Sequence, residues 1–234
     1  LHDLDDGLLK DYDDSLKTFQ KEHNLTIFHL MGQHVNYKLR YRKEQAKFWA
    51  SSYEEKRPEL TTAQRKMLSH YDNATLYNDS IVAQIVKRFQ KEDAVVIYVP
   101  DHGEECYEED RGFICRNHSA NIDWPLAHYE FEIPFWIYCS PKYIRNHRDI
   151  YRQIRKAKDK RFMTDALPHL LLYLAGIETP TYKEEYNILS PKYNEMRPRI
   201  LKNSADYDQL RDEHLEKVEK EKSKKEKSKK GDKK

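Results

Sequence analysis

The stretch AVVIYVPDHGE, from Ala94 to Glu104, constrains the fold of this chain more than any other part of it. Its apolar part is unbroken and rich in Val and Ile, which is typical of a strand buried on both faces. Such strands belong to open α/β sheets, in which ligands bind beyond the carboxyl ends of the strands. Asp101 and His102 therefore stand where a site is expected, and Gly103 allows the backbone to turn sharply and to approach a ligand.

A carboxylate next to an imidazole provides two ordinary ligands for zinc. The alternative interpretation is a strand followed by a plain polar turn, since short motifs of this kind often occur without function. The rest of the chain decides between the two interpretations.

Hydrophobic periodicity predicts an alternation of helices and strands along the chain. The expected helices lie at 4–22, 61–92, 141–159 and 162–175. Besides the strand that precedes Asp101, buried strands are expected at 25–31 and 133–139. This order predicts an α/β fold with a mostly parallel sheet that is flanked by helices on both faces. The irregular segment 104–132 is long for a compact domain, which suggests that it has a function.

The chain has 234 residues, enough for one domain, expected at 1–207, with a Lys/Glu-rich tail at 208–234 that is a frayed helix or disordered. The sequence contains no apolar run of the length that crosses a membrane and no recognisable signal peptide. We expect the chain itself to be soluble. It starts at Leu1 without Met, inside an expected helix, so we also expect it to be a fragment or a processed chain.

The cysteines leave two alternatives open. Cys106 and Cys115 flank an acidic stretch and would form a disulfide in an oxidising compartment, or both would remain free thiols. Cys139 ends an apolar run and is expected to be a buried free thiol.

Further polar residues follow the predicted strands. His34 comes after the run at 25–31, Glu104 follows the Asp-His pair, and His118 lies in the next loop. A Ser, Thr or Cys nucleophile is not obvious among them. Histidines and carboxylates around a zinc ion suit chemistry on a phosphoryl or sulfuryl group, because the metal polarises the oxygen and the side chains handle protons.

Six blocks of sequence then share a family resemblance. They are FHLMGQH at 28–34 followed by Tyr37 and Arg40-Tyr41, YDN at 71–73 with Asp79, DHGE at 101–104, IPFWI at 133–137, TDALPHLLLYLAG at 164–176, and YNILSP at 186–191 with RPRIL at 197–201. Together, and in this order, they resemble the lipid A and lipopolysaccharide phosphoethanolamine transferases of the alkaline phosphatase and sulfatase superfamily.

The resemblance implies roles for individual residues. Asp101 and His102 would be zinc ligands, and His34, Glu104 and His118 would be catalytic and would contact the phosphoethanolamine headgroup or a second zinc. Tyr37 and Arg40 would also bind the substrate. Two further histidines remain as alternatives or supports: His128 competes with His118, and His29 would support the site from outside the ligand set.

The departure from the family pattern is equally informative. In that family a Glu ligand and the Thr nucleophile precede the first histidine block by a long distance, whereas only 28 residues precede His29 here. The chain therefore resembles the C-terminal part of the catalytic domain. The resemblance implies that the nucleophile and the membrane-anchoring region lie outside this chain, and that the chain alone is inactive.

The function predicted for the parent protein is zinc-dependent transfer of phosphoethanolamine from phosphatidylethanolamine to lipid A or to a lipopolysaccharide core sugar. The expected location is the inner membrane of a Gram-negative bacterium, with the catalytic domain facing the periplasm, and nucleic acid is not an expected partner. One alternative is a sulfatase or phosphodiesterase of the same superfamily. Another is a non-enzymatic binding module with a basic tail.

Overall fold

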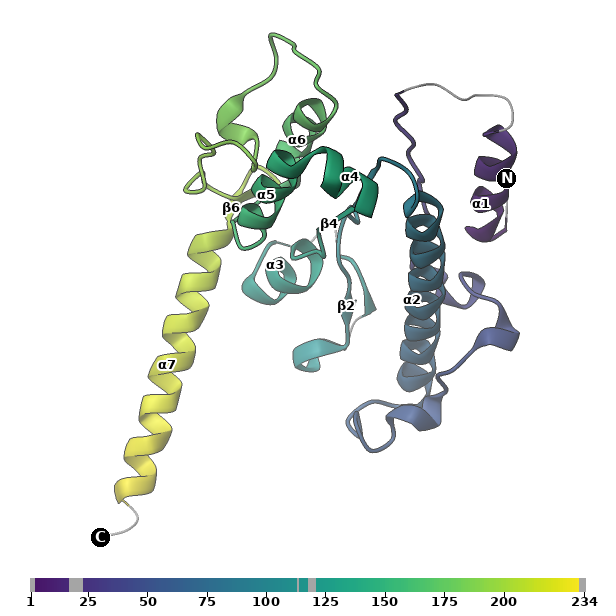
Figure 1. The fold of residues 1–234 in the computed structure, drawn as a ribbon. Coiled ribbons are helices and arrows are strands. Elements are labelled where there is room, and N and C mark those ends of the chain that lie inside the picture. Colours follow the sequence, from purple (N-terminus) through teal and green to yellow (C-terminus); the bar gives the residue numbers. More distant parts are fainter. Residues whose placement is uncertain (1–2, 17–22, 113, 118–120, 232–234) are drawn as a thin grey trace. The chain divides into compact units, whose positions relative to one another are not determined.

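The computed structural model describes residues 3–16, 23–112, 114–117 and 121–231, and its course is shown in Figure 1. The chain divides into two compact units. The first contains Leu1–Val96 and Ser140–Lys142, and the second contains Ile97–Cys139 and Tyr143–Lys234. Strand β1 and helix α4 run from one unit into the other.

The first unit is built on two helices, α1 (Asp6–Ser15) and α2 (Thr62–Phe89). The loop between them contains short 3-10 helices at Tyr37–Leu39, Lys43–Gln45 and Ala50–Tyr53. Helix α2 begins with a capping box, in which Thr61 Oγ1 accepts from the Gln64 N–H and the Thr61 N–H donates to Gln64 Oε1. The helices predicted at 4–22 and 61–92 are thus present, although residues 17–22 lie outside the described part.

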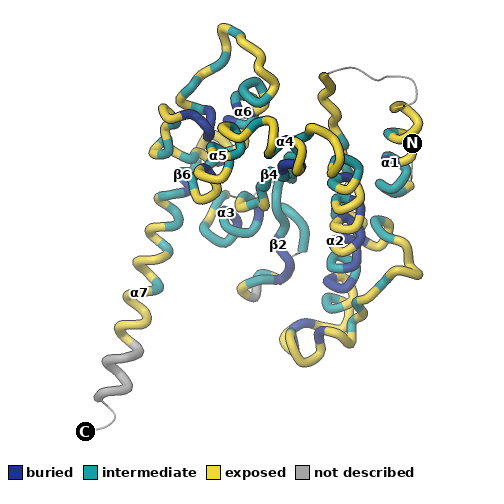
Figure 2. Tube along the Cα trace, in the orientation of Figure 1, coloured by how far each residue is buried: buried dark blue, intermediate teal, exposed yellow. Residues whose placement is uncertain are grey.

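The core of the first unit follows the apolar face of α2. Tyr77, Ile81 and Ile85 are buried at helical spacing and pack against Leu9 of α1. Figure 2 shows this face of α2 as a run of buried residues along the helix. Arg88 of α2 also holds Asp13 of α1 through two hydrogen bonds of 2.8 and 2.7 Å.

The strand predicted at 25–31 is not formed. The segment is extended but has no ladder partner, and Leu25 and Ile27 are 78% and 79% exposed. Phe28 and Leu30, which point the other way, pack on the core of α1 and α2. The apolar pattern is therefore that of a strand with two apolar faces, but only one face is covered here and no neighbouring strand completes the ladder.

In the second unit the remaining strands are short. β1 (Val95–Tyr98) pairs with β4 (Trp136–Cys139), β2 (Glu105–Cys106) pairs antiparallel with β3 (Ile114–Cys115), and β5 (Ile200–Leu201) pairs antiparallel with β6 (Ala205–Asp206). The strands predicted before Asp101 and at 133–139 are confirmed. Their residues are half-buried rather than fully buried, except Cys139. Among the described residues the sheets are two-stranded.

The second unit also contains helices. They are α3 (Trp124–Phe131), α4 (Pro141–Asn146), α5 (Arg148–Ala157), α6 (Leu167–Leu174) and α7 (Tyr207–Gly231), with 3-10 helices at Glu108–Asp110, Thr164–Ala166 and Glu184–Tyr186. Leu170 of α6 is fully buried in a core that includes Ala157, Ile188 and Leu189, and Ile97 and Ile137 of the β1–β4 pair pack on it. Gly176 ends α6 with a left-handed φ of +66°, as expected.

The helix predicted at 141–159 is divided at His147 into α4 and α5, and the helix predicted at 162–175 begins with a 3-10 turn at Thr164–Ala166. The described part of the tail is helical. Of the helices that the structure describes, none combines the length and the apolar character that crossing a bilayer requires.

All three cysteines are free thiols in the structure. In the β2–β3 ladder Cys106 stands opposite Ile114 and Cys115 stands opposite Glu105. Directly opposite residues share a face of the sheet and successive residues alternate, so the two thiols lie on opposite faces. Of the two alternatives, the structure therefore shows the free thiols, and this register disfavours the disulfide; the predicted burial of Cys139 is confirmed.

Candidate functional site

Asp101 and His102 lie in the second unit in the loop that begins after β1, with two residues between Tyr98 and Asp101, as the sequence predicts. The Asp101 side chain is 85% exposed, and its Oδ2 lies 3.6 Å from His102 Nε2. Two ligands of one zinc ion, each about 2.0–2.1 Å from the metal in a tetrahedral site, stand only slightly closer than this. The two side chains therefore have the spacing of a pair of ligands for one ion.

The tautomer of His102 is fixed by the backbone. His102 Nδ1 lies 2.7 Å from the Gly103 carbonyl oxygen, which can only accept a hydrogen bond, so Nδ1 carries the proton. The Nε2 lone pair then faces Asp101. A hydrogen bond from the other ring nitrogen to a carbonyl is the usual support of a metal-ligating histidine.

Gly103 is required by packing. Its N–H donates to the Glu130 carbonyl at the end of α3 over 2.8 Å, and a Cβ built on it would lie 2.3 Å from the Tyr129 carbonyl oxygen. The sequence predicted a sharp turn and a close approach to a ligand. The structure shows a close approach to the backbone of α3, which fixes the loop against a helix, and the approach to a ligand stays a prediction.

A buried ion pair, which the sequence analysis missed, holds the other end of this loop. Glu105 is fully buried, and its two carboxylate oxygens accept from Arg111 Nε and a terminal nitrogen over 2.6 and 3.0 Å. Arg111 also donates to Asp123, the N-cap residue of α3, over 2.9 Å. These bonds, that to Glu105 first, raise the pKa of Arg111 above its ordinary value. No local sequence signal distinguishes Glu105 from the other carboxylates of the segment 104–132, which the sequence predicts to be irregular.

The other site residues predicted in the second unit are Glu104, His118 and its alternative, His128. Glu104 is half-buried beside the Asp-His pair, and His118 lies outside the described residues. His128, the alternative to His118, stacks on Trp124 with ring centroids 5.4 Å apart, and its Nδ1 lies 2.9 Å from Glu132 Oε1. Its contacts are those of a residue that stabilises α3.

His34 belongs to the first unit, in an exposed loop that follows the segment 25–31. The loop is held from α1: Asp5 accepts from the Met31 and Gly32 N–H groups, both over 2.9 Å. Arg40 donates to the His34 and Val35 carbonyl oxygens over 2.8 and 3.1 Å. His29, the expected support of the site, is exposed.

The Tyr-Asp-Asn block of α2 contacts several parts of the connection between α1 and α2, including Tyr37. The buried ring of Tyr37 meets Tyr71 edge to face at 5.3 Å, and Tyr53 donates a hydrogen bond to Asp72. Asn73 is buried and accepts from the Lys47 and Phe48 N–H groups while donating to the Phe48 and Ser69 carbonyls. In the described structure Tyr37 and Arg40 hold the loop, and their contact with a substrate stays a prediction.

The structure therefore brings together the side chains of Asp101 and His102, Glu104 follows them in the sequence, and His34 lies in the other unit. Within residues 3–16, 23–112, 114–117 and 121–231 there is no group of three or more His, Cys, Asp or Glu side chains that would hold a metal ion. Asp101 and His102 fit two ligands of a zinc site that takes four. The other ligands are not found among the described residues.

Comparison with known proteins decides the family. A family model described as sulfatase matches residues 2–177, which is most of the chain. The chain belongs to the sulfatase family. Its fold class is correspondingly that of the alkaline phosphatase and sulfatase-like α/β proteins, present here as a partial domain, and the predicted class is confirmed.

Individual relatives show which enzymes of this family the chain resembles. The chain is 32% identical over 216 residues to phosphoethanolamine transferase EptC of Escherichia coli O18:K1:H7, covering 89% of this chain and 36% of the relative. It is 30% identical over 162 residues to Kdo(2)-lipid A phosphoethanolamine 7''-transferase of Escherichia coli K12, covering 68% of this chain and 27% of the relative. The chain thus spans about a third of the length of the relatives it matches.

A solved structure supports the resemblance to phosphoethanolamine transferases. The C-terminal periplasmic domain of EptC from Escherichia coli, determined in complex with Zn, superposes with a TM-score of 0.72 and 28% sequence identity. The match covers 88% of this chain and 57% of that domain. The predicted resemblance to phosphoethanolamine transferases is therefore confirmed.

Proposed function

We propose that this chain is part of a zinc-dependent enzyme that transfers phosphoethanolamine from phosphatidylethanolamine to lipid A or to a lipopolysaccharide core sugar. The observation that supports this most directly is the Asp101–His102 pair, at ligand spacing beyond β1, in a chain that is 32% identical over 216 residues to a phosphoethanolamine transferase. The parent protein would lie in the inner membrane of a Gram-negative bacterium, with this part facing the periplasm.

In this proposal Asp101 and His102 hold zinc, which when bound polarises a phosphoryl oxygen and favours ionisation of an attacking hydroxyl. The Gly103 carbonyl keeps the proton of His102 on Nδ1, so that Nε2 is available as a ligand. His34, Glu104 and His118 contact the headgroup and transfer protons at the leaving and attacking oxygens. Tyr37 and Arg40 position the loop that carries His34.

The reaction would proceed in two displacements. A Thr hydroxyl, supplied by a region outside this chain, attacks the phosphorus of phosphatidylethanolamine, so that a new P–O bond forms and diacylglycerol leaves with the proton. A hydroxyl or phosphate oxygen of the acceptor then attacks the phospho-enzyme and releases the Thr oxygen. The same region would supply the missing zinc ligands and the connection to the membrane, and the isolated chain would be inactive.

The test uses the parent protein purified in detergent, with labelled phosphatidylethanolamine, and measures diacylglycerol release, transfer to the acceptor and bound zinc. Asp101→Ala and His102→Ala should each lower zinc content and reduce transfer by a factor on the order of 100 or more. Asp212→Ala, an exposed carboxylate of α7, is the matched control and should leave both unchanged. Full transfer by Asp101→Ala would contradict the proposal.

A hydrolase of the same family is the second candidate, because the matching family model is that of sulfatases. Assays with a panel of sulfate and phosphate esters distinguish the hydrolase from the transferase. Steady hydrolysis of a sulfate ester or phosphodiester, lost in Asp101→Ala, without transfer to any lipid acceptor, would favour the hydrolase. The isolated chain with zinc should release no diacylglycerol, and turnover by it would show that it contains its own nucleophile.

A further inference from the structure

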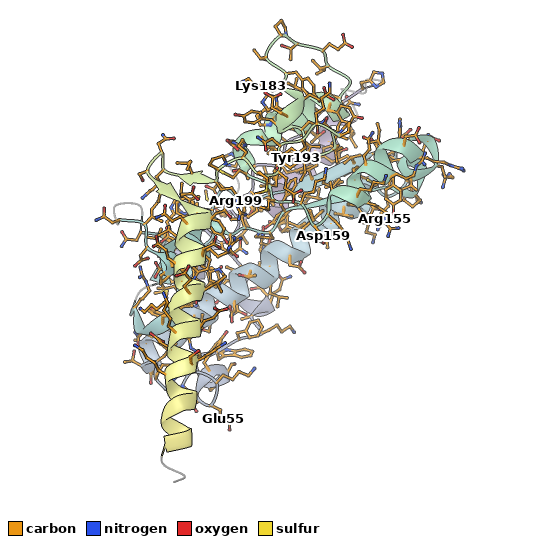
Figure 3. The ribbon with its side chains drawn as sticks, turned by 90° about the vertical axis from the view of Figure 1, so that its left-hand side faces the viewer. Glu55, Arg155, Asp159, Lys183, Tyr193 and Arg199 are labelled. Atoms are coloured by element: carbon orange, nitrogen blue, oxygen red, sulfur yellow. The ribbon has the colours of Figure 1, made fainter. Side chains whose placement is uncertain are left out.

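Helix α5 of the second unit has two faces of opposite character. Ile150, Ile154 and Ala157 pack in the core beside Leu170. On the opposite side four exposed cationic residues follow one another around roughly 100° of the helix, at about 100° per residue: Arg148, Arg152, Arg155 and Lys156. Figure 3 labels Arg155 on α5 and Asp159 just beyond its end.

The charge of this surface is poorly balanced. Between residues 144 and 160 there are seven Lys or Arg residues and two Asp residues. Asp149 pairs with Arg152, and Asp159 lies 3.6 Å from Lys158. Among the described residues, no carboxylate pairs with Arg145, Arg148, Arg155 or Lys156. A single-sign surface of this kind attracts an oppositely charged partner.

The cationic face continues into a basin of about 450 Å³ where α4 and α5 meet. Its lining consists of Ile144, Arg145, Arg148, Tyr151 and Arg152. Guanidinium groups bind phosphate oxygens through paired hydrogen bonds, and each retains its charge at any physiological pH. The tyrosine ring is apolar with a polar tip, which suits the boundary between headgroups and acyl chains.

We propose that this α4–α5 surface, made of the basin and the cationic face of α5, docks the second unit on an anionic lipid bilayer, with the arginines contacting lipid phosphates. Charge complementarity carries the assignment. The rival surface is α7, but residues 207–231 contain nine Lys or Arg and seven Asp or Glu residues, a much smaller positive excess than the seven against two of residues 144–160. Docking does not depend on transfer activity, and a binding measurement tests it separately from the proposed function.

The experiment is co-sedimentation of the chain with vesicles of phosphatidylcholine alone and of phosphatidylcholine with about one-third phosphatidylglycerol. Binding is expected only to the anionic vesicles and should weaken with salt. Each cation near an anionic surface contributes about 1 kcal/mol, which is roughly fivefold in affinity, so Arg148→Glu/Arg152→Glu should weaken binding by at least about 25-fold. Equal binding to both vesicle types would overturn the proposal.

Matched variants separate this surface from the tail. Lys217→Glu/Lys220→Glu on α7 makes the same change in net charge and should alter binding by less than about twofold; truncation after Glu221 should also leave binding in place. Loss of binding in either one, equal to that in the α5 variant, would assign binding to the tail or to net charge. Circular dichroism checks folding, and Arg148→Gln/Arg152→Gln, with an expected loss of smaller size, replaces the reversal variant if that does not fold.

A final experiment distinguishes docking on a bilayer from the binding of a single soluble anion in the basin. Inorganic phosphate at millimolar concentration, with ionic strength held constant, should leave vesicle binding unchanged. Complete displacement by phosphate would show that the basin is a pocket for a single soluble anion, and docking on a bilayer would be wrong.

Discussion

Gly32 and Gly103 stand in the two loops that carry the predicted site residues, and each is required for a different reason. Gly32, in the first unit, has a φ of +53°, and the nearest heavy atom to an added Cβ would be 3.8 Å away. Gly103, in the second unit, lies outside the left-handed region, but its Cβ would stand 2.3 Å from the Tyr129 carbonyl oxygen. Backbone conformation is the reason for glycine in the first loop, and packing is the reason for glycine in the second.

The groups that anchor the two loops also differ, in how deeply they are buried. In the first unit the Asp5 carboxylate accepts two backbone N–H bonds at a partly exposed position. In the second, the carboxylate of Glu105 is fully buried and its partner is the guanidinium of Arg111. Because a buried charge without its partner is far more costly than a partly exposed hydrogen bond, we expect the second loop to be the more sensitive to substitution.

Arg111→Met should have the largest effect. It leaves the Glu105 carboxylate buried without a partner, and we expect a loss of about 3–5 kcal/mol in the free energy of unfolding. Urea denaturation followed by circular dichroism measures it. The double variant Glu105→Leu/Arg111→Met should recover much of the loss, because both charges are then absent. A cost below about 1 kcal/mol for the single variant would remove the distinction between the two loops.

Gly103→Ala is next. The new Cβ meets backbone, which cannot move aside as a side chain does, so we expect a loss of about 1–3 kcal/mol and a displaced Asp101–His102 pair. Zinc binding by the parent protein, measured by metal analysis, should fall with it. If zinc binding and stability both match those of the unsubstituted protein, the close approach to α3 does not constrain the loop.

The sequence predicts the parts of this molecule that depend on local pattern. The helix at 61–92 follows from its apolar spacing and its capping box, and the position of Asp101 and His102 follows from the apolar run that ends before them. Prediction from the sequence fails where tertiary contacts determine the structure. The segment 25–31 has the composition of a strand but no ladder neighbour in the described structure, and the burial of Glu105 against Arg111 depends on the turn that joins β2 to β3. The catalytic role expected for His34 stays a prediction.

Asp5→Ala tests the anchor of the first loop. The substitution removes the acceptor of the Met31 and Gly32 N–H groups, which can turn to water because the site is partly exposed, so a loss of about 1–2 kcal/mol is expected. Asp3→Ala, at an exposed position, is the control and should be neutral within about 0.5 kcal/mol. A loss as large as that of Arg111→Met would contradict the proposed difference between the anchors.

Gly32→Ala should cost about 1 kcal/mol, since the added Cβ has room but a left-handed backbone disfavours Ala. Gly32→Asn should cost less, because Asn tolerates this conformation better. Urea denaturation of both variants gives the comparison. Equal losses in the two variants would indicate that space, rather than backbone conformation, limits this position.

The smallest expected effect concerns acid stability, in which an ion pair of the second unit, Asp165 with Arg197, should respond to pH. Two hydrogen bonds from Arg197 lower the pKa of Asp165 below its ordinary value. A lowered pKa in the folded state means that the stabilisation is present above the unfolded aspartate pKa, about 3.9, and is lost as pH falls through the folded pKa. The Asp165 side chain is 48% exposed, so solvent screening limits the contribution to about 0.5–1 kcal/mol. Asp165→Asn should therefore cost this amount near pH 7 in urea denaturation, and the cost should disappear once the pH lies below the folded pKa. A cost that stays constant into strong acid would show that Arg197 binds the neutral side chain as well as the carboxylate.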